Sequence, residues 1–129
     1  MNPITLPLIE LCKKADFSEN LLNELLNSLK KLSYEVFNVE EKSGFLVNRI
    51  LFKEISYFFY LYEVEKKSIN ELKKIYKVLL KNSDPIKIIN IVGIDTSLTI
   101  LENLNKEDKS IYIPNILKES VKKGVLGFK

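Results

Sequence analysis

The segment 45–63 constrains the fold of this chain more than any other, because it is long, mostly apolar and spaced as a helix. At about 100° per residue its apolar arc covers more than half of the helix circumference, and only Glu54 interrupts that arc. We expect a second domain or subunit to pack there, because a chain of 129 residues has little mass with which to cover so much apolar surface. The opposite arc is polar and holds Asn48, Arg49, Lys53, Ser56 and Glu63.

The N-terminal part of the chain predicts a strand, a helix and a second strand. Residues 6–12 (LPLIELC) form a short apolar run typical of a buried strand, and Asp16 or Ser18 can cap the helix that follows. Leucines at three- and four-residue steps continue that helix to about Ser33, and 34–39 (YEVFNV) predicts the second strand. Such a βαβ unit is normally part of a larger parallel sheet, because two parallel strands alone make a poor sheet.

The rest of the chain predicts helices only. Ser68 and Glu71 form a capping box that begins one helix. Asp84 is a cap residue followed by Pro85 at the first helical position, which predicts a short helix over 85–92.

Gly93 ends that helix, and Asp95 or Thr96 can cap the next one, which we expect to run to about Asn103. The polar run NKEDKS that follows is typical of a loop. Pro114 then opens a last helix, which Gly124 closes. The predicted order is therefore βαβ followed by five helices, a mainly α fold with a small parallel sheet.

Composition excludes several classes of function. Arg49 is the only arginine and the lysines are interspersed with acids, which argues against a sequence-reading nucleic-acid protein. The chain has no His and a single Cys, so metal binding has almost no support. No apolar run is long enough to cross a bilayer, and the N-terminus lacks the basic region and cleavage site of a signal peptide. We therefore expect a cytoplasmic protein with neither a nucleic-acid nor a membrane partner.

Several short segments resemble, in their order and spacing, one known family. They are Asn2-Pro3, Ile9-Glu10, SGFLVNR at 43–49, VGIDT at 92–96 and KKGVLG at 122–127. Together they make the chain similar to the 3-hydroxyacyl-CoA dehydrogenase family over nearly its whole length. The segments GFLVNR and VGIDT carry most of the resemblance.

The resemblance implies a division of the chain. Family members have an N-terminal Rossmann domain that binds NAD and a helical C-terminal domain that mediates dimerisation and helps to close over the acyl-CoA. Residues 1–42 would then be a βαβ remnant of the Rossmann-type sheet, and 43–129 the helical dimerisation and acyl-CoA-closing domain. We expect a homodimer through the 45–63 helix and the helices that follow it.

The same resemblance implies what this chain lacks. The family's G-x-G-x-x-G loop, which holds the NAD pyrophosphate at a helix N-terminus, and its catalytic His are both absent from the sequence. The family's Gly-rich loop is replaced at 81–89 by KNSDPIKII, which keeps Pro85 and has no Gly. We expect this chain alone to hold no cofactor, with NAD bound only where a partner chain supplies the Rossmann domain.

Two residues correspond to family site positions. Glu10 matches the Glu that orients the catalytic His, and Asn48 matches an Asn near that His and the substrate. The alternatives are that Glu10 is only a hydrogen-bond acceptor and that Asn48 satisfies backbone groups in the first helical turn. For Arg49, pairing with CoA phosphates and an interdomain or intersubunit ion pair both remain open.

Two functions of different class follow. In the first, the chain is the second half of a split NAD-dependent 3-hydroxyacyl-CoA dehydrogenase of fatty acid metabolism, with the His and the NAD loop supplied by another polypeptide. In the second, it is a non-enzymatic helical dimer used as a scaffold or regulator, with or without acyl-CoA affinity.

Overall fold

The structure is a computed structural model that describes residues 8–40, 46–81 and 83–128. The chain forms two compact units, Met1–Val47 and Asn48–Lys129, each described here by itself. The predicted domain boundary between residues 42 and 43 lies outside the described residues and stays a prediction.

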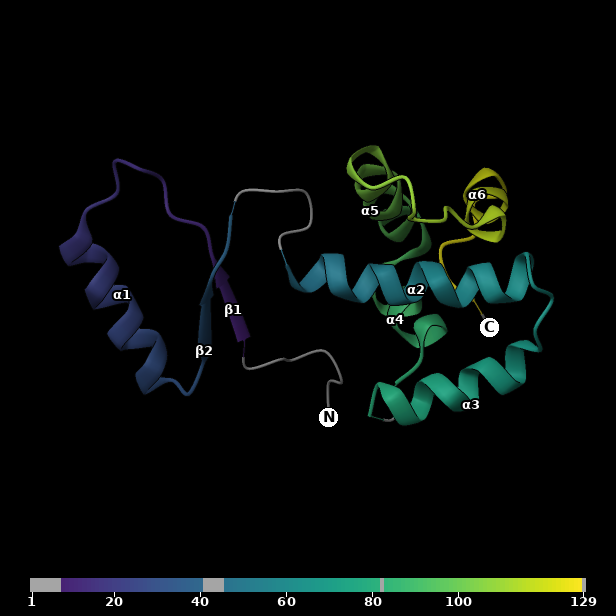
Figure 1. Cartoon of the computed structure of the whole chain (residues 1–129), viewed down its shortest axis with the longest axis horizontal. Helices are drawn as coiled ribbons and strands as arrows, with labels where there is room; N and C mark the ends of the chain where they lie inside the picture. Colours follow the sequence, from purple (N-terminus) through teal and green to yellow (C-terminus); the bar gives the residue numbers. More distant parts are fainter. Residues whose placement is uncertain (1–7, 41–45, 82, 129) are drawn as a thin grey trace. The chain divides into compact units, whose positions relative to one another are not determined.

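The first unit contains β1 (Leu8–Leu11), α1 (Glu19–Lys31) and β2 (Glu35–Asn38). The two strands pair in parallel, with Leu8 opposite Glu35 and Leu11 opposite Asn38 (Figure 1). The predicted strand–helix–strand order is therefore confirmed. Ser18, rather than Asp16, caps α1, because its Oγ accepts a hydrogen bond of 3.5 Å from the Leu21 N–H.

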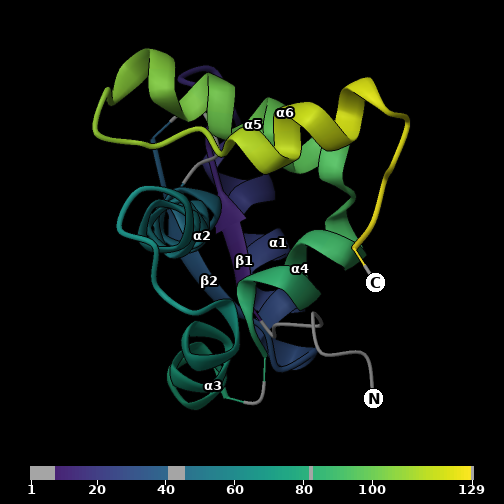
Figure 2. The same ribbon diagram turned by 90° about the vertical axis from the view of Figure 1, so that its right-hand side faces the viewer.

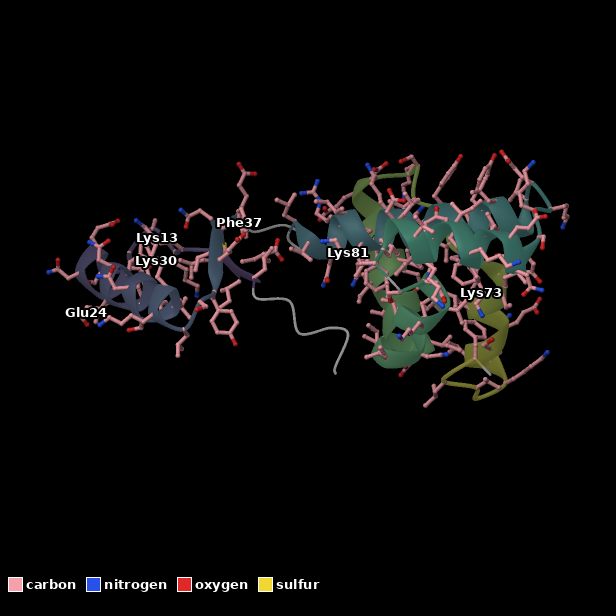
Figure 3. All side chains as sticks on the ribbon, turned by 90° about the horizontal axis from the view of Figure 1, so that it is seen from below. Lys13, Glu24, Lys30, Phe37, Lys73 and Lys81 are labelled. Carbon is pink, nitrogen blue, oxygen red and sulfur yellow. The ribbon has the colours of Figure 1, made fainter. Side chains whose placement is uncertain are left out.

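The first unit buries little apolar surface of its own. No residue of α1 is buried, and all of β1 is only half-buried, so the prediction of a buried strand is wrong for the described residues. The reason is physical, since one helix and two strands cannot cover both faces of a sheet. Figure 3 labels Phe37 on β2 as one of the exposed apolar side chains. Among the described residues of this unit, the exposed large apolar side chains are Phe17, Leu21, Leu25, Leu32, Tyr34, Phe37 and Leu46.

Five helices follow β2 in the described chain, as predicted. They are α2 (Val47–Glu63), α3 (Ile69–Leu79), α4 (Pro85–Val92), α5 (Ile94–Glu107) and α6 (Asn115–Lys122). In Figure 1, α5 and α6 lie on one side of α2, and α3 and α4 lie on the other. Figure 2, which looks along α2, shows the same division. The second unit is thus a bundle built around α2.

The apolar arc of α2 forms the centre of the core. Phe52, Ile55, Phe58 and Phe59 are at most 1% exposed. Phe58 makes edge-to-face contacts with Phe59 and with Tyr76, at ring-centroid distances of 5.1 and 5.3 Å. Most of this arc is therefore covered by the chain itself, and packing of a second domain or subunit on its exposed remainder stays a prediction.

The polar arc of α2 is also partly internal. Ser56 is 3% exposed, and its Oγ accepts from the Tyr112 N–H at 2.7 Å and donates to the Tyr112 carbonyl at 2.8 Å. Glu63 accepts from the N–H groups of Asn115 and Ile116, at 2.8 and 3.3 Å. Ser56 thus binds the segment that leads into α6. Glu63 accepts from N–H groups in the first turn of α6, which have no acceptor within the helix.

The predicted caps of α3, α4 and α6 are confirmed. The Ser68 Oγ accepts from the Glu71 N–H at 3.4 Å, and the Asp84 carboxylate accepts from the Lys87 N–H at 3.0 Å. Pro114 stands at the N-cap of α6, and Gly124 follows that helix with φ 72°.

The predicted limits of α5 are wrong at both ends. Neither Asp95 nor Thr96 caps it, because the helix begins at Ile94, directly after Gly93. It continues past the predicted end at Asn103 to Glu107, so half of NKEDKS is helical rather than loop. Burial of Leu104 in the core, at 4% exposed, favours the extra turn.

Candidate functional site

Glu10 occupies the third position of β1, opposite Phe37 of β2. Its Oε1 accepts hydrogen bonds from the backbone N–H groups of Leu46 at 2.6 Å and of Val47 at 2.7 Å. Val47 is the first residue of α2. The opening N–H groups of a helix have no acceptor within the helix and carry partial positive charge, so a carboxylate stabilises them. Glu10 is therefore a hydrogen-bond acceptor at the start of α2.

The two oxygens of this carboxylate are used differently. Both hydrogen bonds end on Oε1, and within the described residues no donor bonds to Oε2. Glu10 is half-buried, so its position is held while one face of the carboxylate stays accessible. Geometrically, Oε2 can accept a further hydrogen bond, such as one from an imidazole N–H.

Asn48 and Arg49 lie in the first turn of α2, where the sequence placed them. Asn48 is exposed and Arg49 is half-buried. In the part of the chain that the structure describes, neither side chain forms a hydrogen bond or an ion pair. The roles predicted for Asn48 and Glu10 in a substrate site stay predictions.

A second junction joins two segments that carried the sequence resemblance. The Ile94 N–H, at the start of α5, donates to the Leu126 carbonyl oxygen at 3.0 Å. The Phe128 N–H donates to Oδ1 of Asn90 at 2.5 Å, and the Phe128 ring lies 6.5 Å from that of Phe59. The chain after α6 thus returns across the corner between α4 and α5.

Sequence reasoning missed the structural roles of Ser56, Glu63 and Asn90. The sequence held one signal for Asn90, which is one of two polar residues, with Lys87, in the otherwise apolar run PIKIINIV. Ser56 and Glu63 were placed on a polar arc, but the helical pattern does not say which backbone segment lies over that arc. Their partners lie about 50 residues away in sequence.

Neither a metal centre nor a membrane span is found in the described part of the chain. No group of three or more His, Cys, Asp or Glu residues among these positions is arranged to hold a metal ion. None of the described helices is long and apolar enough to cross a bilayer.

Comparison with known proteins identifies the second unit. The family model of the 3-hydroxyacyl-CoA dehydrogenase C-terminal domain matches residues 44–129, more than half of the chain. The chain therefore belongs to the 3-hydroxyacyl-CoA dehydrogenase family. The mainly α fold, with a small parallel sheet before the helices, agrees with this assignment. No curated protein matches the sequence.

Several solved structures share the fold of this chain. M. tuberculosis FadB2 has a TM-score of 0.81 and 24% identity, and the match covers 98% of this chain and 46% of that one. The (S)-3-hydroxybutyryl-CoA dehydrogenase PaaH1 from Ralstonia eutropha has a TM-score of 0.80 and 26% identity, with 97% and 45% covered. The Escherichia coli 3-hydroxybutyryl-CoA dehydrogenase has a TM-score of 0.74 and 14% identity, with 95% and 27% covered. The chain spans less than half the length of each of these proteins.

Proposed function

We propose that this chain supplies the C-terminal, acyl-CoA-closing part of a NAD-dependent 3-hydroxyacyl-CoA dehydrogenase of fatty acid metabolism in the cytoplasm. The NAD-binding sheet and the catalytic His would come from a Rossmann-domain partner chain. The observation that carries this proposal is the two-stranded parallel sheet of the first unit, next in sequence to a C-terminal domain of this family.

The first unit has the properties of a piece of a larger parallel sheet. In the described residues its sheet holds two strands, and neither strand pairs with a third. The strand Leu8–Leu11 is half-buried and apolar apart from Glu10, which is typical of a strand inside a larger parallel sheet. Leu21 of α1 is 57% exposed, and Leu32, the C-cap residue of that helix, is 68% exposed. If a partner sheet buried this apolar surface, the assembly would gain about 25 cal/mol of stabilisation for each Å² removed from water.

Glu10 would be a positioning residue in the assembled enzyme. Its Oε1 is held by Leu46 and Val47, which leaves Oε2 to accept the N–H of an imidazole. Such a bond sets the tautomer of the His and stabilises the imidazolium formed when the His takes the proton of the substrate hydroxyl. NAD would supply the hydride acceptor for the carbon that bears this hydroxyl.

Asn48 would contact the substrate. It is exposed in the first turn of α2 and makes no side-chain hydrogen bond within the described residues, so its amide N–H groups are available to a carbonyl. Donation to the substrate carbonyl would orient the acyl group during reduction.

The proposal includes a homodimer formed by the second unit. Three apolar side chains on α3 are exposed, namely Ile75, Val78 at 81% and Leu79. Exposed apolar groups that cluster on one helix are typical of interaction surfaces. Sedimentation of the chain at micromolar concentration should show a dimer, and Val78→Glu should shift it toward a monomer. A wild-type chain that sediments as a monomer would remove the homodimer from the proposal.

The second candidate function is a non-enzymatic helical dimer that serves as a scaffold or regulator. The Gly-free sequence of 81–89 and the exposed face of α3 favour it. This candidate predicts the same dimer but no NADH-dependent chemistry with any partner.

Calorimetry separates the two candidates. Acetoacetyl-CoA and NADH would be titrated into the purified chain, alone and mixed with a candidate NAD-binding polypeptide encoded beside it. Binding of both ligands that requires the mixture supports the dehydrogenase. Absence of binding in the mixture, with the dimer retained, supports the scaffold or regulator.

A further inference from the structure

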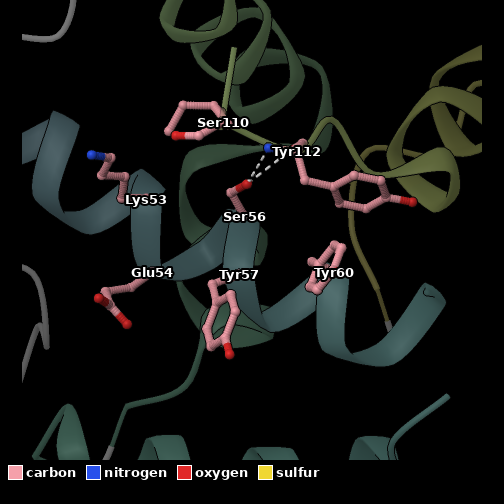
Figure 4. Close-up of a pocket in the computed structure, with 8 residues that line it drawn as sticks. Lys53, Glu54, Ser56, Tyr57, Tyr60, Ser110 and Tyr112 are labelled. Carbon is pink, nitrogen blue, oxygen red and sulfur yellow. Dashed lines mark hydrogen bonds between the residues drawn. The ribbon is translucent and has the colours of Figure 1, made fainter. Parts of the chain in front are cut away.

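A cleft lies on the second unit between α2 and the segment that connects α5 to α6 (Figure 4). Its volume is about 380 Å³, which is within the range of small-molecule sites. One wall is α2, with Lys53, Glu54, Ser56, Tyr57 and Tyr60. The other wall is 110–112.

The two walls are held together by hydrogen bonds. Ser56 bonds to both backbone groups of Tyr112, at 2.7 and 2.8 Å, in the middle of the cleft. At one end, Lys53 pairs with Asp108 at 3.3 Å. The Asp108 carboxylate also accepts from the backbone N–H and the hydroxyl of Ser110, at 3.0 and 2.6 Å. A cleft held in this way loses little conformational entropy when a ligand binds.

The cleft is lined by three aromatic rings. Tyr57 and Tyr60 are one helical turn apart, with ring centroids 6.1 Å apart and an interplanar angle of 14°. Tyr112 meets the Tyr60 ring edge-on at 5.8 Å. Tyr57 is 53% exposed, so part of its side chain is accessible to a ligand. A flat aromatic ligand can stack on such a surface.

The polar groups of the cleft determine which aromatic ligand fits. The ammonium group of Lys53 is paired with Asp108, whereas Glu54 has no hydrogen bond or ion pair in the described part of the chain. The unpaired charged group at the rim is therefore a carboxylate, which only accepts hydrogen bonds. A flat ring that carries N–H donors complements both this carboxylate and the exposed ring of Tyr57.

We propose that this cleft binds an adenine ring, stacked on Tyr57 and donating its exocyclic amine to the Glu54 carboxylate. Adenine is part of both free nucleotides and CoA thioesters. Only the identification of the ligand as an acyl-CoA rests on the proposed function. Stacking of the ring on Tyr57 requires nothing from a Rossmann partner. The site is thus testable on this chain by itself.

The test is a titration of the wild-type chain with AMP, with CoA and with UMP, followed by NMR or calorimetry. We expect AMP and CoA to bind and UMP to bind at least about fivefold more weakly, since a pyrimidine offers a smaller ring for stacking. If CoA binds much more tightly than AMP, the ligand of the cleft is a CoA thioester. Equal affinities identify a free nucleotide.

Three variants assign any binding to the cleft. Tyr57→Ala should weaken AMP binding by about tenfold or more, whereas Tyr57→Phe should retain it within about threefold. Glu54→Gln should weaken AMP binding without changing the fold. Tyr34→Ala, an exposed tyrosine of the first unit, is the matched control and should have no effect.

Failure is recognised without reference to dehydrogenase activity. The inference is overturned if AMP does not bind at millimolar concentration, if UMP binds as tightly as AMP, or if Tyr57→Ala binds AMP like the wild type. A chain that supports NADH oxidation with a partner but fails this titration retains the proposed function and loses the adenine site.

Discussion

The backbone N–H of Ile94 donates a 3.0 Å hydrogen bond to the carbonyl oxygen of Leu126, 32 residues further along the chain. Gly93, with φ 99°, turns the backbone from α4 directly into α5, and no side chain caps α5. The returning segment after α6 supplies an acceptor instead. VGIDT and KKGVLG, which are separate motifs in the sequence, therefore meet through this hydrogen bond.

The bond between Asn90 and Phe128 should contribute measurably to stability. Asn90→Ala removes the acceptor of the Phe128 N–H and loosens the Phe128 ring from Phe59. We expect the free energy of unfolding to fall by ~1 kcal/mol. Urea denaturation would measure it, with the exposed Asn103→Ala on α5 as control. Equal effects of the two substitutions would contradict a specific role for Asn90.

The two buried serines should respond in opposite ways to removal of the hydroxyl. Ser56→Ala leaves the Tyr112 N–H and carbonyl without their side-chain partner, which should cost ~2 kcal/mol or more. Ser97 is fully buried, and its Oγ has no partner in the described part of the chain, so Ser97→Ala should be neutral or stabilising. Thermal and urea denaturation of both variants would measure the difference. Similar losses in both would show that the Ser56 bonds do not contribute as described.

Tyr76 should make stability depend on pH in the alkaline range. Burial, together with the negative charge of Glu54 and then Tyr57, raises the pKa of Tyr76 from 10.0 to about 12. Between pH 10 and pH 12 the folded protein keeps the Tyr76 proton, whereas the unfolded chain releases it. The contribution of Tyr76 to the free energy of unfolding is therefore complete below pH 10 and is lost as the pH rises toward 12. The loss should reach ~2 kcal/mol.

The control for this effect is Tyr76→Phe, which keeps the aromatic ring against Phe58 and removes the titrating hydroxyl. Between about pH 9 and pH 11.5 the free energy of unfolding of the wild type should fall relative to that of Tyr76→Phe. Tyr112, whose pKa is also raised by burial and by Glu63, titrates in both proteins and cancels. Parallel pH profiles would contradict the assignment to Tyr76.

Much of the fold could be predicted from local sequence signals. Ser18, Ser68 and Asp84 cap helices where their side chains can reach N–H groups three residues ahead, which is a local property. The end of α5 could not be predicted in this way. The polar run from Asn105 suggests a loop, but Leu104 packs in the core and Asn105 donates to the Ile111 carbonyl at 2.8 Å.

The candidate site was less predictable, because its contacts are long-range. Sequence resemblance singled out Glu10, but its two bonds to Leu46 and Val47 span more than 35 residues. The helical pattern places Ser56 on the polar face of α2, so it looked like a surface residue. The pattern does not show that the segment at Tyr112 covers this face. Tertiary packing, rather than local propensity, decides both cases.

The most direct test of the proposed dehydrogenase is the steady-state rate of acetoacetyl-CoA-dependent NADH oxidation by the chain assembled with the proposed NAD-binding partner. Glu10→Gln retains an acceptor for Leu46 and Val47 but removes the charge that would support an imidazolium. We predict that it lowers kcat by about a hundredfold or more and leaves KM nearly unchanged, whereas Glu24→Gln on the exposed face of α1 has no effect. No NADH oxidation by the wild-type assembly, or equal rates for the two variants, would contradict the account.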